Sequence, residues 1–172
     1  MEDLLDKFKN NNYVVIKNFL SKDMTDFLYY YIKMAAGKRN YLDEIKYYGE
    51  NSTTTQKEEY GYYTDPQAYG AFSRYGDLIF DSLLTYKQDK VEAATGLQLC
   101  PNYSYHRLYV TGHDLKPHKD RASCDLSATV CIGYDNRNLD YDYNWPIYME
   151  DTEVNMQPGD MVIYKGCELT HY

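Results

Sequence analysis

Several features that often define a protein class are absent from this sequence of 172 residues. It contains no run of about 18 apolar residues, so no membrane-spanning segment is predicted. The first residues lack the basic start and apolar run of a signal peptide, which favours a soluble, cytoplasmic protein. The four cysteines form no C-x-x-C pair, which excludes a zinc ribbon and a thioredoxin-like motif and favours reduced thiols in the core.

Basic residues are also scarce relative to acidic ones. The sequence has 18 Lys and Arg against 26 Asp and Glu, which gives a net charge of −8. Proteins that follow the phosphates of a nucleic acid generally present a basic face. We therefore expect neither a nucleic-acid partner nor a membrane partner. Nothing in the sequence indicates the oligomeric state.

The order of the predicted elements is helices first and mostly strands later. Residues 13–20 are rich in strand formers, and Ser21 is a candidate N-cap for a helix over residues 22–36 that ends at Gly37. A second helix is predicted over residues 73–94 from the spacing of its apolar side chains. Further strands are expected over residues 97–100, 104–111, 128–134, 145–149 and 160–164.

Between the two predicted helices, residues 38–66 are polar and show little periodicity. A loop of this length is often a lid or a binding segment, and a flexible connector is the alternative that the sequence leaves open. The total length fits one domain, since about 100–200 residues per domain is usual. No change of composition marks a boundary within the chain.

His118, Asp120 and His171 are the most informative residues. In a strand, residues i and i+2 point to the same face, so His118 and Asp120 converge. His171 follows the last expected strand, which begins at a Pro-Gly-Asp turn at 158–160 and ends at Gly166. Two His and one carboxylate on one face are the set with which non-heme Fe(II) oxygenases hold iron and keep other coordination positions open. The sequence therefore predicts a metal site.

The segment 109–120 resembles a known family pattern, in which a Tyr, two residues and a Gly precede His-x-Asp. This pattern is found in the 2-oxoglutarate and Fe(II)-dependent dioxygenases, the prolyl 4-hydroxylase-like branch in particular. The resemblance implies an α+β protein with a mainly β core: a double-stranded β-helix, or jelly roll, with N-terminal helices packed on one sheet. It also implies His118, Asp120 and His171 as the ligands of Fe(II), and Tyr109 as a contact of 2-oxoglutarate.

On this resemblance we expect a hydroxylase that oxidises an unactivated C–H bond with Fe(II), 2-oxoglutarate and dioxygen. The family branch favours a prolyl residue in a peptide or protein as the substrate, and a free amino acid or another small molecule fits the residues equally well. Halogenation would call for the loss of the carboxylate ligand, but Asp120 is present. The alternative from a different class is a non-catalytic, cupin-like jelly roll that binds a metal as a binding or structural module.

The sequence departs from the family pattern after the second histidine. In the family, a basic residue on a later strand pairs with the distal carboxylate of 2-oxoglutarate, a contact that Arg or Lys provides. Here no Arg or Lys follows His171, since the sequence ends at Tyr172. We therefore expect residues 1–172 to be a single dioxygenase domain that lacks its C-terminal strand or strands, which leaves a sheet edge uncovered.

Four further residues are candidates for the surroundings of the metal. Thr129 and Cys131 occupy alternate positions on the strand after the motif and are expected to line the co-substrate pocket. Arg121 is a candidate for orienting a substrate carboxylate, and an ion pair with Asp125 is an equal alternative. Trp145 is expected in the core or in the wall of a substrate pocket.

The two remaining histidines are not expected to be ligands. His106 lies in an alternating run, where a position on the sheet surface or beside the ligands is favoured over ligation. His113 and Asp114 are neighbours, so on a strand they would face opposite sides and could not share a metal. A turn after Gly112 is the favoured position for this pair.

Overall fold

The computed structural model describes residues 4–137, 143 and 145–172. The chain forms two compact units. The first contains Met1–Leu28, Lys87–Asn102 and Pro117–Tyr172, and the second contains Tyr29–Tyr86 and Tyr103–Lys116. Helices and antiparallel strands occur in both units, which confirms a mixed protein of helices and strands. The jelly roll and the single-domain organisation stay predictions.

The first unit is built on a three-stranded antiparallel sheet in the order β1-β7-β4, formed by β1 (Tyr13–Ile16), β7 (Met161–Tyr164) and β4 (Ser127–Val130). All four residues of the central strand are buried. This agrees with their sequence, because an apolar run bounded by turn residues is typical of a strand covered on both faces. In register, Ile163 pairs with Val14 on one side and with Ala128 on the other.

A hairpin of β5 (Ile147–Met149) and β6 (Thr152–Val154) packs next to this sheet. Its apolar side chains share one buried cluster with the central strand, and the cluster consists of Ile147, Met149, Val154, Met156, Val162 and Tyr164. Cys131 and Leu169 pack against the cluster from its edge. The core of the first unit therefore lies between the hairpin and β7.

Two short helices complete the first unit. The helix α1 (Leu4–Asn11) packs against β1 and against α5 (Gln88–Thr95). Gly96 ends α5 in the left-handed conformation, with a φ of 70°, and a Cβ at this position would lie 2.8 Å from the Leu5 side chain. Glycine adopts this φ without strain, which explains why the helix ends here.

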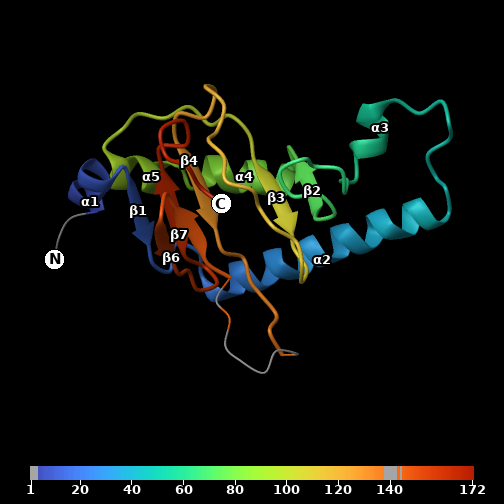
Figure 1. Ribbon diagram of the computed structural model, residues 1–172, viewed down its shortest axis with the longest axis horizontal. Helices are drawn as coiled ribbons and strands as arrows, with labels where there is room; N and C mark the ends of the chain where they lie inside the picture. Colours follow the sequence, from blue (N-terminus) through green and yellow to red (C-terminus); the bar gives the residue numbers. More distant parts are fainter. Residues whose placement is uncertain (1–3, 138–142, 144) are drawn as a thin grey trace. The chain divides into compact units, whose positions relative to one another are not determined.

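The second unit contains a two-stranded antiparallel sheet of β2 (Phe72–Tyr75) and β3 (Tyr105–Leu108), together with the helices α4 (Leu78–Tyr86) and α3 (Thr54–Glu58). Most of α2 (Lys22–Glu44) also belongs to it. Figure 1 shows α2 as one continuous long helix. In the part of the chain that the structure describes, no helix combines the length and the apolar character needed to cross a membrane.

The predicted end of the first helix at Gly37 was wrong, because α2 continues through this residue to Glu44. Arg39 stabilises the extra turns: it forms an ion pair with Asp43 one turn later and donates hydrogen bonds to the carbonyls of Lys57 and Gly61. The expected loop over 38–66 therefore contains the end of α2 and all of α3. Its role as a lid stays a prediction.

The predicted helix over residues 73–94 was wrong at its start and in its middle. Residues 72–75 form β2 instead, because they pair along their whole length with β3. The Asp77 carboxylate then accepts the N–H of Ile79 at the start of α4, and the helical stretch is divided between α4 and α5. Residues 97–100 are not a strand, and β6 was not predicted.

Candidate metal centre

Backbone pairing places the two predicted histidine ligands side by side. The His118 N–H donates to the His171 carbonyl at 3.1 Å, and the His171 N–H donates to the His118 carbonyl at 2.9 Å. On its other side His171 forms an antiparallel bridge with Met149 of β5. The last described residues therefore lie between the segment of His118 and the hairpin, and both neighbours fix the position of His171.

The carboxylate ligand is fixed in a similar way. The Asp120 N–H donates to the carbonyl of Gly166 at 2.9 Å, which ties this residue to the turn after β7. The thiol of Cys167 donates to the carbonyls of Arg121 and Cys124 at 3.2 and 3.4 Å. Two segments that are distant in sequence, one around Asp120 and one before His171, are thus joined by hydrogen bonds.

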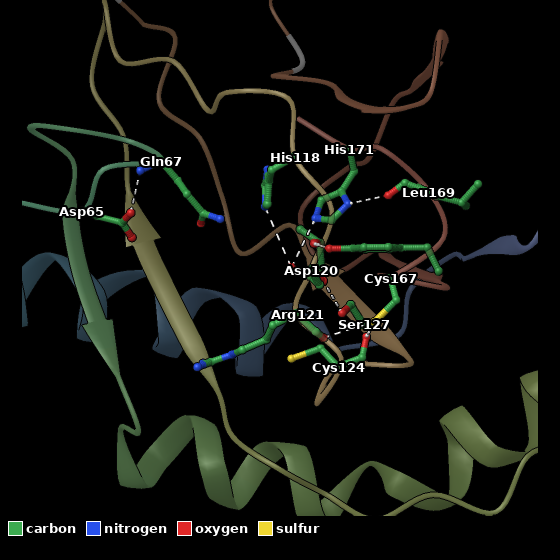
Figure 2. Close-up of polar contacts among 12 residues, drawn as sticks. Asp65, Gln67, His118, Asp120, Arg121, Cys124, Ser127, Cys167, Leu169 and His171 are labelled. Carbon is green, nitrogen blue, oxygen red and sulfur yellow. Dashed lines mark hydrogen bonds and ion pairs between the residues drawn. The ribbon is translucent and has the colours of Figure 1, made fainter.

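The three side chains converge on one point, as Figure 2 shows. One carboxylate oxygen of Asp120, Oδ1, lies 3.9 Å from Nε2 of His118 and 3.7 Å from Nε2 of His171. One ligand atom from each residue falls within 4.8 Å of the other two, and no other such group of three occurs among the residues that the structure describes. The structure therefore brings together all three predicted ligands.

The imidazole of His171 is oriented by its surroundings. Its Nδ1 lies 3.1 Å from the carbonyl oxygen of Leu169, and its ring packs on the ring of Tyr164 with centroids 4.6 Å apart. Burial lowers the pKa of His171, against the opposing influence of the Leu169 carbonyl and the Asp120 charge. When the imidazole is neutral and its Nδ1–H donates to a carbonyl, Nε2 carries a free lone pair. This is the form of histidine that binds metals through Nε2.

The three residues fit a bound transition-metal ion. Two donor atoms that share an ion at about 2.1 Å lie at most about 4.2 Å apart, and both measured separations from Asp120 Oδ1 are shorter than this. Two imidazole nitrogens and one carboxylate oxygen suit a divalent first-row metal, Fe(II) included. The side chains of His118 and Asp120 are 16% and 22% exposed, so the site stays accessible from one side.

Two residues near Asp120 were not predicted from the sequence. The Ser127 hydroxyl donates to the Oδ2 oxygen of Asp120, and Gly166 lies directly against the same oxygen. Ser127 is the first residue of β4, and the segment 121–126 before it shows no periodicity from which its direction could be read. Gly166 was predicted only as the end of a strand.

Of the predicted pocket residues, Thr129 lies in β4 of the first sheet and Cys131 follows directly after this strand. The Thr129 hydroxyl lies 3.2 Å from the hydroxyl of Tyr164, whose ring packs on His171. Cys131 packs against the core cluster and exchanges backbone hydrogen bonds with the turn at Gly159 and Asp160. Burial raises the pKa of the Cys131 thiol to about 11, so it is protonated at neutral pH.

Arg121 and Trp145 were predicted as substrate contacts. The side chain of Arg121 extends away from the three converging groups in Figure 2. Trp145 is 37% exposed and packs edge-on against the ring of Tyr143 at 5.5 Å, so it does not lie in the core, and its alternative position in the wall of a substrate pocket stays a prediction. Its φ of 46° lies in the left-handed region, which is rare for a bulky side chain.

Tyr109, His106 and His113 belong to the second unit. Burial raises the pKa of Tyr109, while the nearby Arg107 opposes the rise, so the hydroxyl stays protonated. His113 lies in a turn, where its N–H donates to the Val110 carbonyl, and this confirms its predicted position. His106 is buried rather than on a sheet surface, because the rings of Phe72 and Phe80 cover it.

The four cysteines are free thiols, as predicted. Cys100 is exposed, whereas Cys124, Cys131 and Cys167 are half-buried. The expectation that all four lie in the core was therefore wrong for Cys100. Its segment, residues 97–100, does not pair into a sheet that would cover it.

Comparison with known proteins gives a structural relative but no sequence relative. No family model and no curated protein matches the chain. Among solved structures, the fold is similar to that of a prolyl-4-hydroxylase from Pseudomonas putida, with a TM-score of 0.60 and 14% sequence identity. The match covers 98% of this chain and 87% of that one. At this identity the likeness shows a prolyl-4-hydroxylase-like fold and no more.

Proposed function

We propose that the protein is an Fe(II)- and 2-oxoglutarate-dependent oxygenase with a jelly-roll core. The observation that carries the proposal is the convergence of His118, Asp120 and His171, whose donor atoms gather around one point. The similarity of the fold to that of the Pseudomonas putida prolyl-4-hydroxylase supports it. A non-catalytic metal-binding module would explain the three ligands, but it would not explain why this enzyme fold surrounds them.

In this proposal Nε2 of His118, Oδ1 of Asp120 and Nε2 of His171 hold Fe(II). Fe(II) held in this way supplies the reductive activation of dioxygen that hydroxylation of an unactivated C–H bond requires. Three protein ligands on one face would leave the ion open on its other side to 2-oxoglutarate and dioxygen. The burial of His171 keeps its ring neutral, and Leu169 holds the ring in the tautomer that presents Nε2.

The remaining assignments concern the co-substrate and the substrate. Tyr109, Thr129 and Cys131 are proposed to contact 2-oxoglutarate, and Arg121 and Trp145 to contact the substrate. A prolyl residue in a peptide is the first substrate to test, because the solved structure of similar fold is that of a prolyl-4-hydroxylase. The acidic composition favours such a peptide or a small molecule over a nucleic acid.

An anaerobic titration with Fe(II) and 2-oxoglutarate tests the proposal. Chelation of Fe(II) by 2-oxoglutarate should produce a weak visible charge-transfer band that is lost in His118→Ala. His113→Ala is the matched control, since His113 does not belong to the group of converging metal-binding side chains and should leave the band unchanged. A protein that binds Fe(II) but gives no band with 2-oxoglutarate would contradict the oxygenase and favour the metal-binding module.

The substrate class is tested by turnover. Succinate formation from 2-oxoglutarate is measured with and without a panel of proline-containing peptides, and mass spectrometry detects the gain of one oxygen atom. With the wild-type protein we expect oxygen addition at a proline of one of the peptides. With His118→Ala we expect no such addition. Succinate formation without oxygen addition to any proline peptide would contradict the prolyl substrate but keep the oxygenase.

A further inference from the structure

The two oxygens of the Asp120 carboxylate have different surroundings. Oδ1 faces the two imidazoles, 3.9 Å from His118 and 3.7 Å from His171. Oδ2 instead accepts a hydrogen bond from the Ser127 hydroxyl at 2.5 Å. Figure 2 shows Ser127 on the side of Asp120 that faces away from the histidines. One oxygen is therefore turned toward the candidate metal position and the other is held by the protein.

Gly166 closes the space behind this carboxylate. A Cβ at position 166 would lie 2.4 Å from Oδ2 of Asp120, 2.5 Å from the Ser127 hydroxyl and 3.0 Å from the Cys124 carbonyl. The φ of Gly166 lies outside the left-handed region, so the demand for glycine comes from space and not from backbone conformation. The Gly166 carbonyl also accepts the N–H of Asp120, which holds this residue against the glycine.

Ser127 is itself held by the sheet that supports the other side of the site. It is the first residue of β4, and its partner across the ladder is Tyr164 of β7. The ring of Tyr164 packs on His171. One cross-strand pair therefore supports two of the three ligands: Ser127 holds Asp120, and Tyr164 holds His171.

We infer that Ser127 and Gly166 restrict Asp120 to a single metal-facing oxygen, an inference that rests on the proposed metal site. The hydrogen bond from the Ser127 hydroxyl holds Oδ2 toward the protein and away from the ion. Gly166 lets the carboxylate lie close enough for this hydrogen bond to form. With one oxygen from Asp120 and one nitrogen from each histidine, an octahedral ion keeps three open positions. A carboxylate that chelated with both oxygens would take one of them.

The test is a count of metal-bound waters in the protein loaded with Mn(II) alone. Broadening of the Mn(II) electron paramagnetic resonance signal by ¹⁷O-labelled water reports this number. We expect about three waters in the wild-type protein, because the three protein ligands leave the remaining coordination positions of an octahedral Mn(II) ion to water. In Ser127→Ala we expect about two, because the released oxygen joins the metal, together with an affinity for Mn(II) that falls about 10- to 100-fold.

Two variants serve as controls, and a third replaces Ser127→Ala if that variant does not fold. Ser127→Thr keeps the hydroxyl and should keep both the water count and the affinity. Ser123→Ala removes an exposed hydroxyl from the neighbouring connection and should change neither. If Ser127→Ala does not fold, as judged by circular dichroism, Ser127→Cys replaces it: the thiol is of similar size but a weak donor, so we expect the same loss of one water.

Gly166→Ala tests whether the Asp120 carboxylate needs the space that glycine leaves at position 166. The added methyl group displaces the Asp120 carboxylate, and the affinity for Mn(II) should fall by at least about 10-fold. Gly37→Ala is the matched control, since a Cβ there meets nothing within 4 Å.

The outcomes separate this inference from the proposed function. If the wild-type protein binds no Mn(II), the metal site itself is wrong and the inference falls with it. If the wild-type protein binds Mn(II) with about three waters and the folded Ser127 variant that lacks the hydroxyl shows the same count and affinity, the inference is overturned and the metal site stands.

Discussion

The two buried histidines of this protein, His171 in the first unit and His106 in the second, have the same burial but different partners. His171 is 3% exposed and His106 is 6% exposed, and burial lowers the pKa of both. His171 has a carbonyl against Nδ1 and a carboxylate facing Nε2. Neither ring nitrogen of His106 has a hydrogen-bond partner among the described residues.

The surroundings of His106 explain why it is not a ligand. Its ring packs against Phe80, Phe72 and Tyr31, with centroids 4.6, 6.0 and 6.5 Å away. The nearest charges belong to Asp77 and Arg74, which form an ion pair with each other at 2.6 Å. Burial alone therefore does not make a histidine a metal ligand. Of these two histidines, only His171 has a carbonyl against Nδ1 and a carboxylate facing Nε2 in the part of the chain that the structure describes.

The largest difference is expected in metal binding. His171→Ala removes a ligand and should lower the affinity for Fe(II) by more than about 100-fold, beyond what the loss of a supporting contact costs. His106→Phe should leave the affinity unchanged. Anaerobic equilibrium dialysis measures both variants. Equal losses in the two would show that the histidines act on the metal through stability and not through ligation.

The next difference is expected in the free energy of unfolding. His106→Ala leaves a cavity among aromatic rings and should cost about 2–4 kcal/mol. His106→Phe keeps the ring volume and removes two buried polar atoms without partners, so it should change stability by less than about 1 kcal/mol or increase it. Denaturant unfolding at pH 7 measures both. A loss in His106→Phe as large as that in His106→Ala would show that the ring nitrogens have partners.

The pH dependence of stability sharpens the same comparison. Burial lowers the pKa of His106 to about 4, and Asp77 opposes this only in part. The unfolded chain therefore binds more protons than the folded one between pH ~6.5 and pH ~4. The contribution of neutral His106 to the free energy of unfolding is fully present above pH ~6.5. It is lost as the pH falls to ~4, and the loss amounts to at most about 3 kcal/mol.

His106→Phe isolates this contribution from that of the carboxylates. The free energy of unfolding is measured with denaturant at pH 7 and at pH 4.5. Between these two values it should fall less in His106→Phe than in the wild-type protein. Identical pH profiles for the two proteins would mean that His106 is protonated in the folded state or reaches water.

The smallest effect is expected at Tyr164, which supports His171. Tyr164→Phe keeps the ring against the imidazole and loses the hydroxyl contact with Thr129. It should cost about 1 kcal/mol of unfolding free energy and leave metal affinity nearly unchanged. Tyr164→Leu also removes the ring and should weaken Fe(II) binding further. An equal effect of both variants on Fe(II) affinity would show that the ring does not orient His171.

The sequence predicted the ligands because their signals are local. The spacing of His118 and Asp120 predicted their convergence from strand geometry, although the structure gives this segment an isolated bridge at His118 and not a strand. The Pro-Gly-Asp turn predicted the strand before His171. The turn itself is confirmed: Gly159 has a φ of 95°, and a Cβ there would lie 2.9 Å from the Leu20 carbonyl. The buried Asp160 carboxylate accepts from Lys17 and from the N–H of Asn18, which ties the turn to the end of β1.

The features that the sequence did not predict depend on contacts between distant segments. Ser127 meets Asp120 only because the irregular connection between them folds back. The burial of His106 depends on Phe72 and Phe80. The residues directly after Phe72 were predicted as the start of a helix, because β3, the partner strand of β2, lies about thirty residues later. Pairing between distant strands overrides local propensity. The prediction of a sheet-surface position for His106 used only the alternation within residues 103–109, and it was wrong for this reason.

The most direct test of the central claim is the stoichiometry of Fe(II) binding under anaerobic conditions. We predict a single tightly bound Fe(II) per chain in the wild-type protein and in His106→Phe. His118→Ala, Asp120→Ala and His171→Ala should each lose it while keeping the circular dichroism of the wild-type protein. A folded variant that lacks any one of these three side chains and still binds Fe(II) with wild-type affinity would contradict the account.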